Sequence, residues 1–180
     1  MAVRIGLAAL AALALAACGQ GGDQGKDAST ANDASTTERV MARISTPQDN
    51  LSADERAQLE GVIRDYLSAS AAQYAAGFSP LASGGESIAP LQPLTNHDFT
   101  VPVSAGVTYR VVGGCDNECN NVDLEVRDAG GAVVASDAAP DDHPVVSFTP
   151  TASGTYSVRL LLKTCTIAPC YVGARVLQQS

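Results

Sequence analysis

Residues 99–111 have the sequence FTVPVSAGVTYRV, in which two alternating segments flank a turn at Ala105-Gly106. The apolar members at every second position are Phe99, Val101, Val103, Val107, Tyr109 and Val111. Alternation with a period of two is typical of a strand that buries one face and exposes the other. The stretch therefore predicts two short β-strands joined by a turn.

The same pattern continues from this stretch to the C-terminus. Turn sequences at residues 128–131 (DAGG) and at Ser153-Gly154 separate further apolar segments. The strands expected after residue 113 cover residues 122–127, 133–135, 145–148, 155–163 and 171–177. Short strands at near-regular spacing indicate an antiparallel sandwich or barrel.

One amphipathic helix is expected before the strands. Ser52 and Glu55 form a capping-box pattern, and apolar residues recur at helical spacing up to Tyr74. We predict a helix over 52–76 that packs on the β-domain; the alternative is a helix that binds a partner. A short helix is also expected at 37–45. The Pro-, Gly- and Ser-rich segment 79–93 predicts a connector without regular structure.

The N-terminus has the pattern of an export signal. Arg4 is followed by an apolar run to Ala17 that is too short to span a bilayer. Residues 15–18 (LAAC) resemble the bacterial lipobox, in which the cysteine is acylated and becomes the new N-terminus. This resemblance implies a signal peptide at 1–17, lipidation (diacylglycerol, palmitate) at Cys18 and a lipid-anchored cell-envelope protein. Gly19 in place of aspartate favours the outer membrane, at its periplasmic or surface face.

The charge and composition of the chain limit the classes of partner that it can bind. The formal net charge is −8, which argues against nucleic acid as a charge-driven partner. Residues 18–37 are small and polar and predict a flexible tether. The predicted organisation is therefore a signal peptide, this tether, a helical segment with connector at 38–93, and a β-domain at 94–180.

The other four cysteines, Cys115, Cys119, Cys165 and Cys170, predict disulfides in an exported domain. If each connection reverses the chain direction, successive loops alternate between the two ends of the sandwich. This strand parity places all four cysteines at one end, together with loop 137–144. Local bridges, 115–119 and 165–170, are favoured because Pro169 lies in the short loop of a hairpin end. Bridges crossing between the two loops and a four-cysteine zinc site are the alternatives.

The strand and turn motifs of the C-terminal half are similar to those of the bacterial pre-peptidase C-terminal domain. They include 101–109 (VPVSAGVTY), 122–124 (VDL), 128–131 (DAGG), 148–150 (FTP) and 153–158 (SGTYSV). The resemblance covers about residues 97–178 and extends to collagenase collagen-binding modules. It implies a mainly β fold, an antiparallel jelly-roll-like β-sandwich of seven or eight strands preceded by one amphipathic helix. It also implies a role beside secreted proteases, although this chain shows no protease domain.

Acidic side chains are concentrated at the cysteine end. Carboxylates are the oxygen ligands that calcium prefers. We therefore predict a candidate calcium site from Asp116, Glu118, Asp123, Asp141 and Asp142. The alternative is an acidic rim in which Asx turns shape the loops.

The sequence favours a binding protein over an enzyme. It has two histidines, His97 before the first strand and His143 in a loop, and no nucleophile elbow, P-loop or metalloprotease helix. We therefore expect no catalytic residue and a non-catalytic, membrane-anchored interaction module. Its partner would be an envelope protein or an extracellular polymer. The alternatives are an envelope structural or assembly factor acting through helix 52–76, or the accessory partner of a secreted protease.

Overall fold

The computed structural model describes residues 51–180. The predicted signal peptide, Cys18, the tether at 18–37 and the short helix at 37–45 all lie outside the described residues. Within residues 51–180, no helix is both long enough and apolar enough to cross a membrane.

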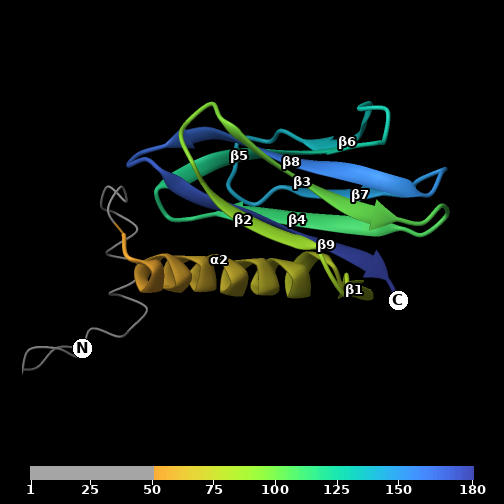
Figure 1. The fold of residues 1–180 in the computed structure, drawn as a ribbon, viewed down its shortest axis with the longest axis horizontal. Helices are drawn as coiled ribbons and strands as arrows, with labels where there is room; N and C mark the ends of the chain where they lie inside the picture. The colour runs from red at the N-terminus through yellow and green to blue at the C-terminus, as the bar shows by residue number, and fades with distance from the viewer. Residues whose placement is uncertain (1–50) are drawn as a thin grey trace, which may run out of the picture. The chain divides into compact units, whose positions relative to one another are not determined.

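Residues 51–180 form a β-sandwich of two antiparallel sheets with one helix on the outside (Figure 1). Sheet A has the order β1-β9-β4-β7, with β2 also paired to β9, and sheet B has the order β3-β8-β5-β6. The strands are β1 (Phe78–Pro80), β2 (Glu86–Leu91), β3 (Asn96–Val103), β4 (Tyr109–Cys115), β5 (Cys119–Arg127), β6 (Val133–Asp137), β7 (Val145–Phe148), β8 (Gly154–Cys165) and β9 (Cys170–Gln179). The predicted mainly β sandwich is thus confirmed.

The core between the sheets comes from the alternating residues. On β5, the side chains of Val122, Leu124 and Val126 are fully buried, whereas the charged residues between them are half-exposed. On β8, Val158, Leu160 and Leu162 are buried in the same way. Sheet B therefore turns one face to the core and the other to solvent, as a period of two requires.

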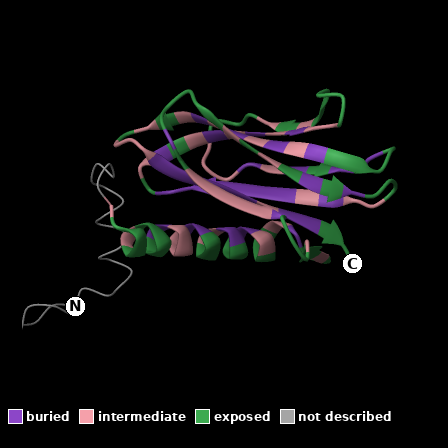
Figure 2. Ribbon diagram, viewed as in Figure 1, coloured by how far each residue is buried: buried purple, intermediate pink, exposed green. Residues whose placement is uncertain are grey.

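Helix α2 (Ala53–Tyr74) covers the outer face of sheet A (Figure 1). Ser52 is its N-cap: the Glu55 amide donates to Ser52 Oγ at 3.3 Å, and the Ser52 amide donates to Glu55 Oε2 at 2.9 Å. The predicted capping box is therefore present. Leu59, Ile63 and Leu67 are buried on the side of the helix that faces the sheet (Figure 2). This packing confirms the prediction that the helix docks on the β-domain.

Two glycines allow the helix to approach the sheet closely. Gly114 of β4 and Gly173 of β9 are register partners. A Cβ atom on Gly114 would lie 2.3 Å from the Tyr66 ring, and one on Gly173 would lie 2.8 Å from a methyl carbon of Ile63. Any larger residue at these positions would push α2 away from sheet A.

The segment predicted as a connector is partly regular, which corrects the sequence interpretation. Strands β1 and β2 lie within or next to residues 79–93, and both pair with β9. The sandwich therefore begins before residue 94, and residues 51–180 contain nine strands rather than seven or eight. Pro80 and Pro90 are tolerated because β1 and β2 form the edge of sheet A, where a missing amide donor costs no ladder bond.

The strand directions bring three loops to one end of the sandwich. β4 runs antiparallel to both β7 and β9, so the end of β4 lies level with the starts of β7 and β9. Loop 116–118 follows β4, and loops 138–144 and 166–169 lead into β7 and β9, so all three loops lie at that end. The Val122 amide also donates to the Asp141 carbonyl at 3.0 Å, which ties loop 138–144 to β5. The predicted clustering of the cysteine loops is thus confirmed.

Candidate binding site at the disulfide-bonded loops

Two local disulfides close the loops at this end of the described domain. Cys115–Cys119 joins the end of β4 to the start of β5, with 5.9 Å between the Cα atoms. Cys165–Cys170 joins β8 to β9, with 6.1 Å between the Cα atoms. The favoured pairing is therefore the one present, and neither crossed bridges nor a four-thiolate zinc site is formed. Disulfides also indicate an oxidising compartment outside the cytoplasm.

The two closed loops form one surface, which we call the cysteine-loop surface (residues 116–118 and 166–169). β5 and β8 are neighbours in sheet B, and Cys119 is the register partner of Cys165. The Thr166 amide donates to the Glu118 carbonyl at 2.7 Å, and Thr166 Oγ1 donates to the same oxygen at 3.0 Å. These cross-loop bonds hold the two loops in a fixed relation.

Asp116 fastens this surface to the sandwich from inside. Only 3% of the residue is exposed. The Tyr171 amide donates to Asp116 Oδ2 at 2.6 Å, and the Asp116 amide donates to the Tyr171 carbonyl at 3.0 Å. Asp116 Oδ1 is buried and has no hydrogen-bond partner in the described part of the chain. The residue that sequence reasoning offered as a calcium ligand is therefore a buried clamp between loop 116–118 and β9.

The Asp116 carboxyl has a pKa raised to about 6. Burial is the main cause, because it disfavours the charged form. The hydrogen bond from the Tyr171 amide opposes this shift, and the negative charge of Glu118 adds to it. The carboxyl is therefore ionised, at a cost, above pH 6 and neutral well below it.

We expect Asp116→Asn to remove a pH dependence of stability. The folded-state pKa of Asp116, about 6, lies above its ordinary value of 3.8, so protonation favours the folded state. The parent should therefore gain about 2 kcal/mol of unfolding free energy from this group as the pH falls from 8 to 4. The variant should be more stable than the parent at pH 8, and the difference should vanish towards pH 4. Urea unfolding at each pH measures it; parallel pH profiles for the two proteins would contradict it.

The other four acidic residues of the predicted calcium set do not converge. Glu118 Oε2 accepts a hydrogen bond from Thr166 Oγ1 at 2.5 Å, and Asp123 Oδ2 lies 3.4 Å from Lys163 Nζ. Asp141 and Asp142 both lie next to His143. Residues 51–180 contain no group of three or more acidic, histidine or cysteine side chains that could hold a metal ion. The residues as arranged do not fit a calcium site, and calcium binding stays a prediction.

The two histidines differ in setting. His97 lies within β3 and is half-buried, so the prediction that it precedes the first strand is wrong. Its Nε2 lies 2.7 Å from Ser87 Oγ, a pair that links β2 to β3. In the part of the chain that the structure describes, no carboxylate hydrogen-bonds the His97 ring, so a serine–histidine–acid relay is not assembled there. His143 lies in loop 138–144, as predicted.

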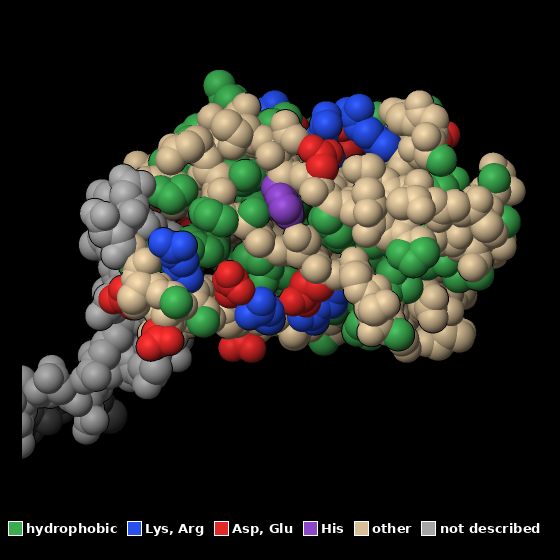
Figure 3. Space-filling view, viewed as in Figure 1, with side chains coloured by type: hydrophobic (Ala, Val, Ile, Leu, Met, Phe, Trp, Pro, Cys, Tyr) green, Lys and Arg blue, Asp and Glu red, His purple; other side chains and the backbone are tan. Residues whose placement is uncertain are grey.

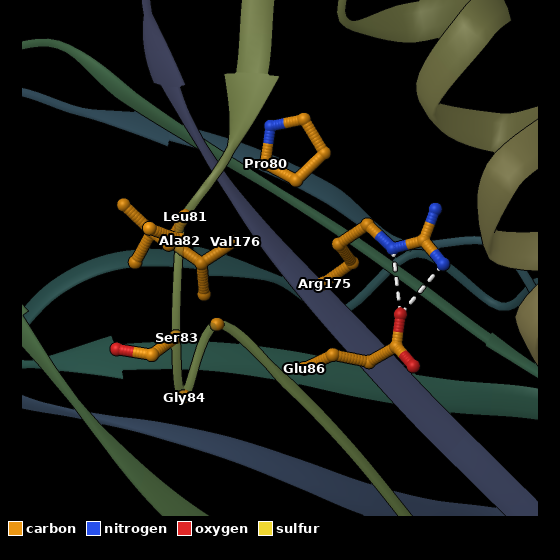
Figure 4. Close-up of a pocket in the computed structure, with 9 residues that line it drawn as sticks. Pro80, Leu81, Ala82, Ser83, Gly84, Glu86, Arg175 and Val176 are labelled. Carbon is orange, nitrogen blue, oxygen red and sulfur yellow. Dashed lines mark hydrogen bonds and ion pairs between the residues drawn. The ribbon is translucent and has the colours of Figure 1, made fainter.

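A hollow of 490 Å³ lies beside segment 81–85 and is lined by Glu86 and Arg175 among others (Figure 4). Arg175 Nε donates to Glu86 Oε2 at 2.7 Å, and a second guanidinium nitrogen lies 2.6 Å from the same oxygen. Figure 3 shows acidic and basic side chains alternating over this face beside α2. Arg64 Nε of α2 also lies 3.2 Å from Glu86 Oε1. Arg175 also donates to Ser68 Oγ of α2 at 2.9 Å, so it links β9 to the helix. Its charge is already paired with Glu86, so it does not offer a free anion site.

Sequence reasoning missed these two pairs, Ser87 with His97 and Glu86 with Arg175. Glu86 and Ser87 lie in the segment 79–93, which the sequence predicts as a connector, and a connector has no regular side-chain directions. If residues 86–91 are taken as an edge strand, the alternation of its side chains indicates which of them lie on the face towards β3 and which on the opposite face.

The fold and these loops make this chain a disulfide-bonded β-sandwich protein whose closed loops are joined at one end. Residues 95–161 match the family described as "Bacterial pre-peptidase C-terminal domain". The match to residues 95–161 confirms the resemblance to the pre-peptidase C-terminal domain that was inferred from the strand and turn motifs.

Two solved structures are similar to this chain. One is the crystal structure of PliG from Aeromonas hydrophila, a periplasmic inhibitor of g-type lysozyme, at 15% identity and a TM-score of 0.39; the match covers 54% of this chain and 92% of that one. The other is the glycosylation-associated protein (Gap123) complex from Streptococcus agalactiae, at 15% identity and a TM-score of 0.31, covering 58% of this chain and 40% of that one. No curated protein matches the chain.

Proposed function

We propose that this protein is a non-catalytic binding module of the cell envelope that contacts a protein partner through the cysteine-loop surface. The observation that carries the proposal is that a local disulfide closes each of the loops 116–118 and 166–169, and that hydrogen bonds from Thr166 to Glu118 join the two closed loops. A preorganised surface loses less conformational entropy on binding than mobile loops would. The tip of loop 166–169 also presents Ile167, Ala168 and Pro169, which are half-exposed.

We propose further that lipid on Cys18 holds the module at a membrane, with the outer membrane favoured by Gly19. The lipobox-like residues 15–18 and the polar segment 18–37 support this location. Two or more acyl chains give a stable anchor, because each buried methylene contributes about 0.8 kcal/mol.

The alternative of an assembly factor acting through α2 has less support. The apolar side of the helix is already buried against sheet A through Leu59, Ile63 and Leu67. A partner would therefore have to bind its polar side. A role as the accessory of a secreted protease rests on the family match at residues 95–161.

Site-specific photo-crosslinking in cells tests the contact surface. A benzoylphenylalanine at Ile167 should capture a partner, whereas the same residue at Ala152, in the turn 150–154 at the other end of β8, should not. A third position, Gln58, reports on the exposed side of α2. Each variant is first checked for an unchanged melting temperature. Products at Gln58 or Ala152 but not at Ile167 would refute the cysteine-loop surface and, for Gln58, favour the alternative.

Cys18→Ser in the Ile167 background tests the anchor in the same experiment. The expected result is loss of acyl mass at residue 18 and release of the protein from the membrane fraction. Partners that reside in the same membrane should then no longer be captured. Retention of the protein in the membrane fraction would contradict the lipid anchor. The contact surface would still be tested by the comparison of crosslinking from Ile167 and from Ala152.

A further inference from the structure

A second depression of 250 Å³ lies between α2 and loop 138–144. It is lined by Tyr66, Ala69, Ser70, Gln73, Tyr74 and His143, and we call it the aromatic cleft. Its helical residues lie on one side of α2, and the Tyr66 ring packs over Gly114 of β4. The cleft shares no residue with the cysteine-loop surface.

The aromatic cleft has flat walls held in place. The rings of Tyr74 and His143 are nearly parallel, with an interplanar angle of 18° and 6.3 Å between their centroids. Loop 138–144 fixes the imidazole, because His143 Nδ1 lies 2.8 Å from Asp142 Oδ1 and the His143 amide donates to Asp141 Oδ1 at 3.2 Å. The imidazole face is therefore preorganised, and the Tyr74 ring lies nearly parallel to it.

The cleft also has a negative rim. Asp141 and Asp142 are half-exposed and lie beside His143, whose pKa is raised mainly by its hydrogen bond with Asp142. Even with a protonated imidazole, the two carboxylates leave the rim negative. Their charge reaches the cleft wall: burial is the main cause of the raised pKa of Tyr66, and the negative charges of Asp142 and Asp141 add to it. Arg110 contributes a positive charge near the end of α2, but its guanidinium donates to the Tyr74 carbonyl and to Ser147 Oγ and lies 4.8 Å over the Phe78 ring.

We propose that the aromatic cleft binds the guanidinium group of an arginine side chain on a partner protein. The guanidinium is planar and stacks on aromatic faces, and a carboxylate can accept two of its N–H groups. Tyr74 and His143 supply the faces, and Asp141 and Asp142 supply the negative charge that complements it. The size of the cleft suits one long side chain rather than a folded segment. This proposal does not depend on the cysteine-loop surface.

Titration of the full chain with short peptides tests the chemistry. The probes are N-acetyl-Gly-Arg-Gly-amide, its lysine analogue and its citrulline analogue, which keeps the shape but lacks the charge. The ring resonances of Tyr66, Tyr74 and His143 should shift with the arginine peptide and not with the citrulline peptide. Added salt should weaken the binding, because half-exposed carboxylates are screened.

Three variants locate the site. Tyr74→Leu and Asp142→Asn should each weaken binding of the arginine peptide by about threefold to tenfold. Asp98→Asn is the matched control: Asp98 also pairs with a cationic side chain, Arg159, but lies in β3 of the other sheet, and it should leave binding unchanged. Circular dichroism and melting temperature check that each variant folds.

Two results would overturn the proposal. Equal binding of the arginine and citrulline or lysine peptides would show that a planar cation is not what the cleft selects. Unchanged binding in both Tyr74→Leu and Asp142→Asn would place the peptide elsewhere. Neither result bears on crosslinking from Ile167, so this proposal and the proposed function can fail separately.

Discussion

Leu67→Ala is expected to lower the free energy of unfolding by about 2–5 kcal/mol, because it leaves a cavity between α2 and sheet A. The Leu67 side chain is fully buried and belongs to the cluster that joins the helix to β4 and β9. The nearest way to fill the cavity would be a shift of α2 towards the sheet. That shift is blocked because the Tyr66 ring already lies against Gly114 and Ile63 against Gly173. We therefore expect a loss towards the upper part of this range.

Urea or thermal unfolding measures this loss, with Leu94→Ala as the matched control. Leu94 is 74% exposed, so removal of the same atoms there should change stability by no more than about 0.5 kcal/mol. If Leu67→Ala and Leu94→Ala unfold at the same urea concentration, the helix does not contribute to the cooperative fold. In that case helix α2 would be available to a partner, and the alternative function would gain support.

Replacement of both Cys115 and Cys119 by alanine is expected to cost about 2–4 kcal/mol. The bridge restrains the unfolded chain only over a short loop, so the entropic part is at the lower end for a disulfide. Both residues are also almost fully buried in the core between the sheets, so loss of their sulfur atoms removes packing as well. The same bridge closes the loop that contains Asp116, so its loss would also loosen the hydrogen bonds between Asp116 and Tyr171.

The Cys165→Ala/Cys170→Ala protein provides the comparison for this prediction. Its bridge closes a loop of nearly the same length, so a similar entropic cost is expected. A reducing agent should bring the parent below either double variant, because it opens both bridges. Should the Cys115→Ala/Cys119→Ala protein unfold at the same urea concentration as the parent, the bridge would contribute nothing to stability. Hydrogen exchange at the Tyr171 amide then shows whether the Asp116 clamp has opened.

Predictions from sequence were accurate where near neighbours along the chain control the structure. The capping box of Ser52 and Glu55 forms within one helical turn, and each disulfide joins cysteines separated by only four or five positions. The connector prediction for 79–93 was wrong for the opposite reason. β2 is a strand because β9, some eighty residues further along the chain, supplies its hydrogen bonds, while its own prolines suggested irregular structure.

The candidate site was only partly predictable. Strand parity correctly brought the four cysteines together, because each connection reverses the chain direction. Parity says nothing, however, about which way a side chain points from a loop. Asp116 turns inward to the Tyr171 amide and is buried, whereas Asp141 and Asp142 turn to His143. Five carboxylates that share one end of the domain therefore do not share one site.

The sequence by itself determined the β-sandwich, the amphipathic helix and the end at which the cysteine loops lie. These features depend on periodicity, turn residues and chain direction, all of which are local. Only the tertiary structure decided that β2 completes sheet A, that Asp116 is a buried clamp and that Tyr66, Tyr74 and His143 line one cleft. Each of these depends on contacts between residues far apart in the chain, and such contacts exist only once the helix and both sheets have packed together.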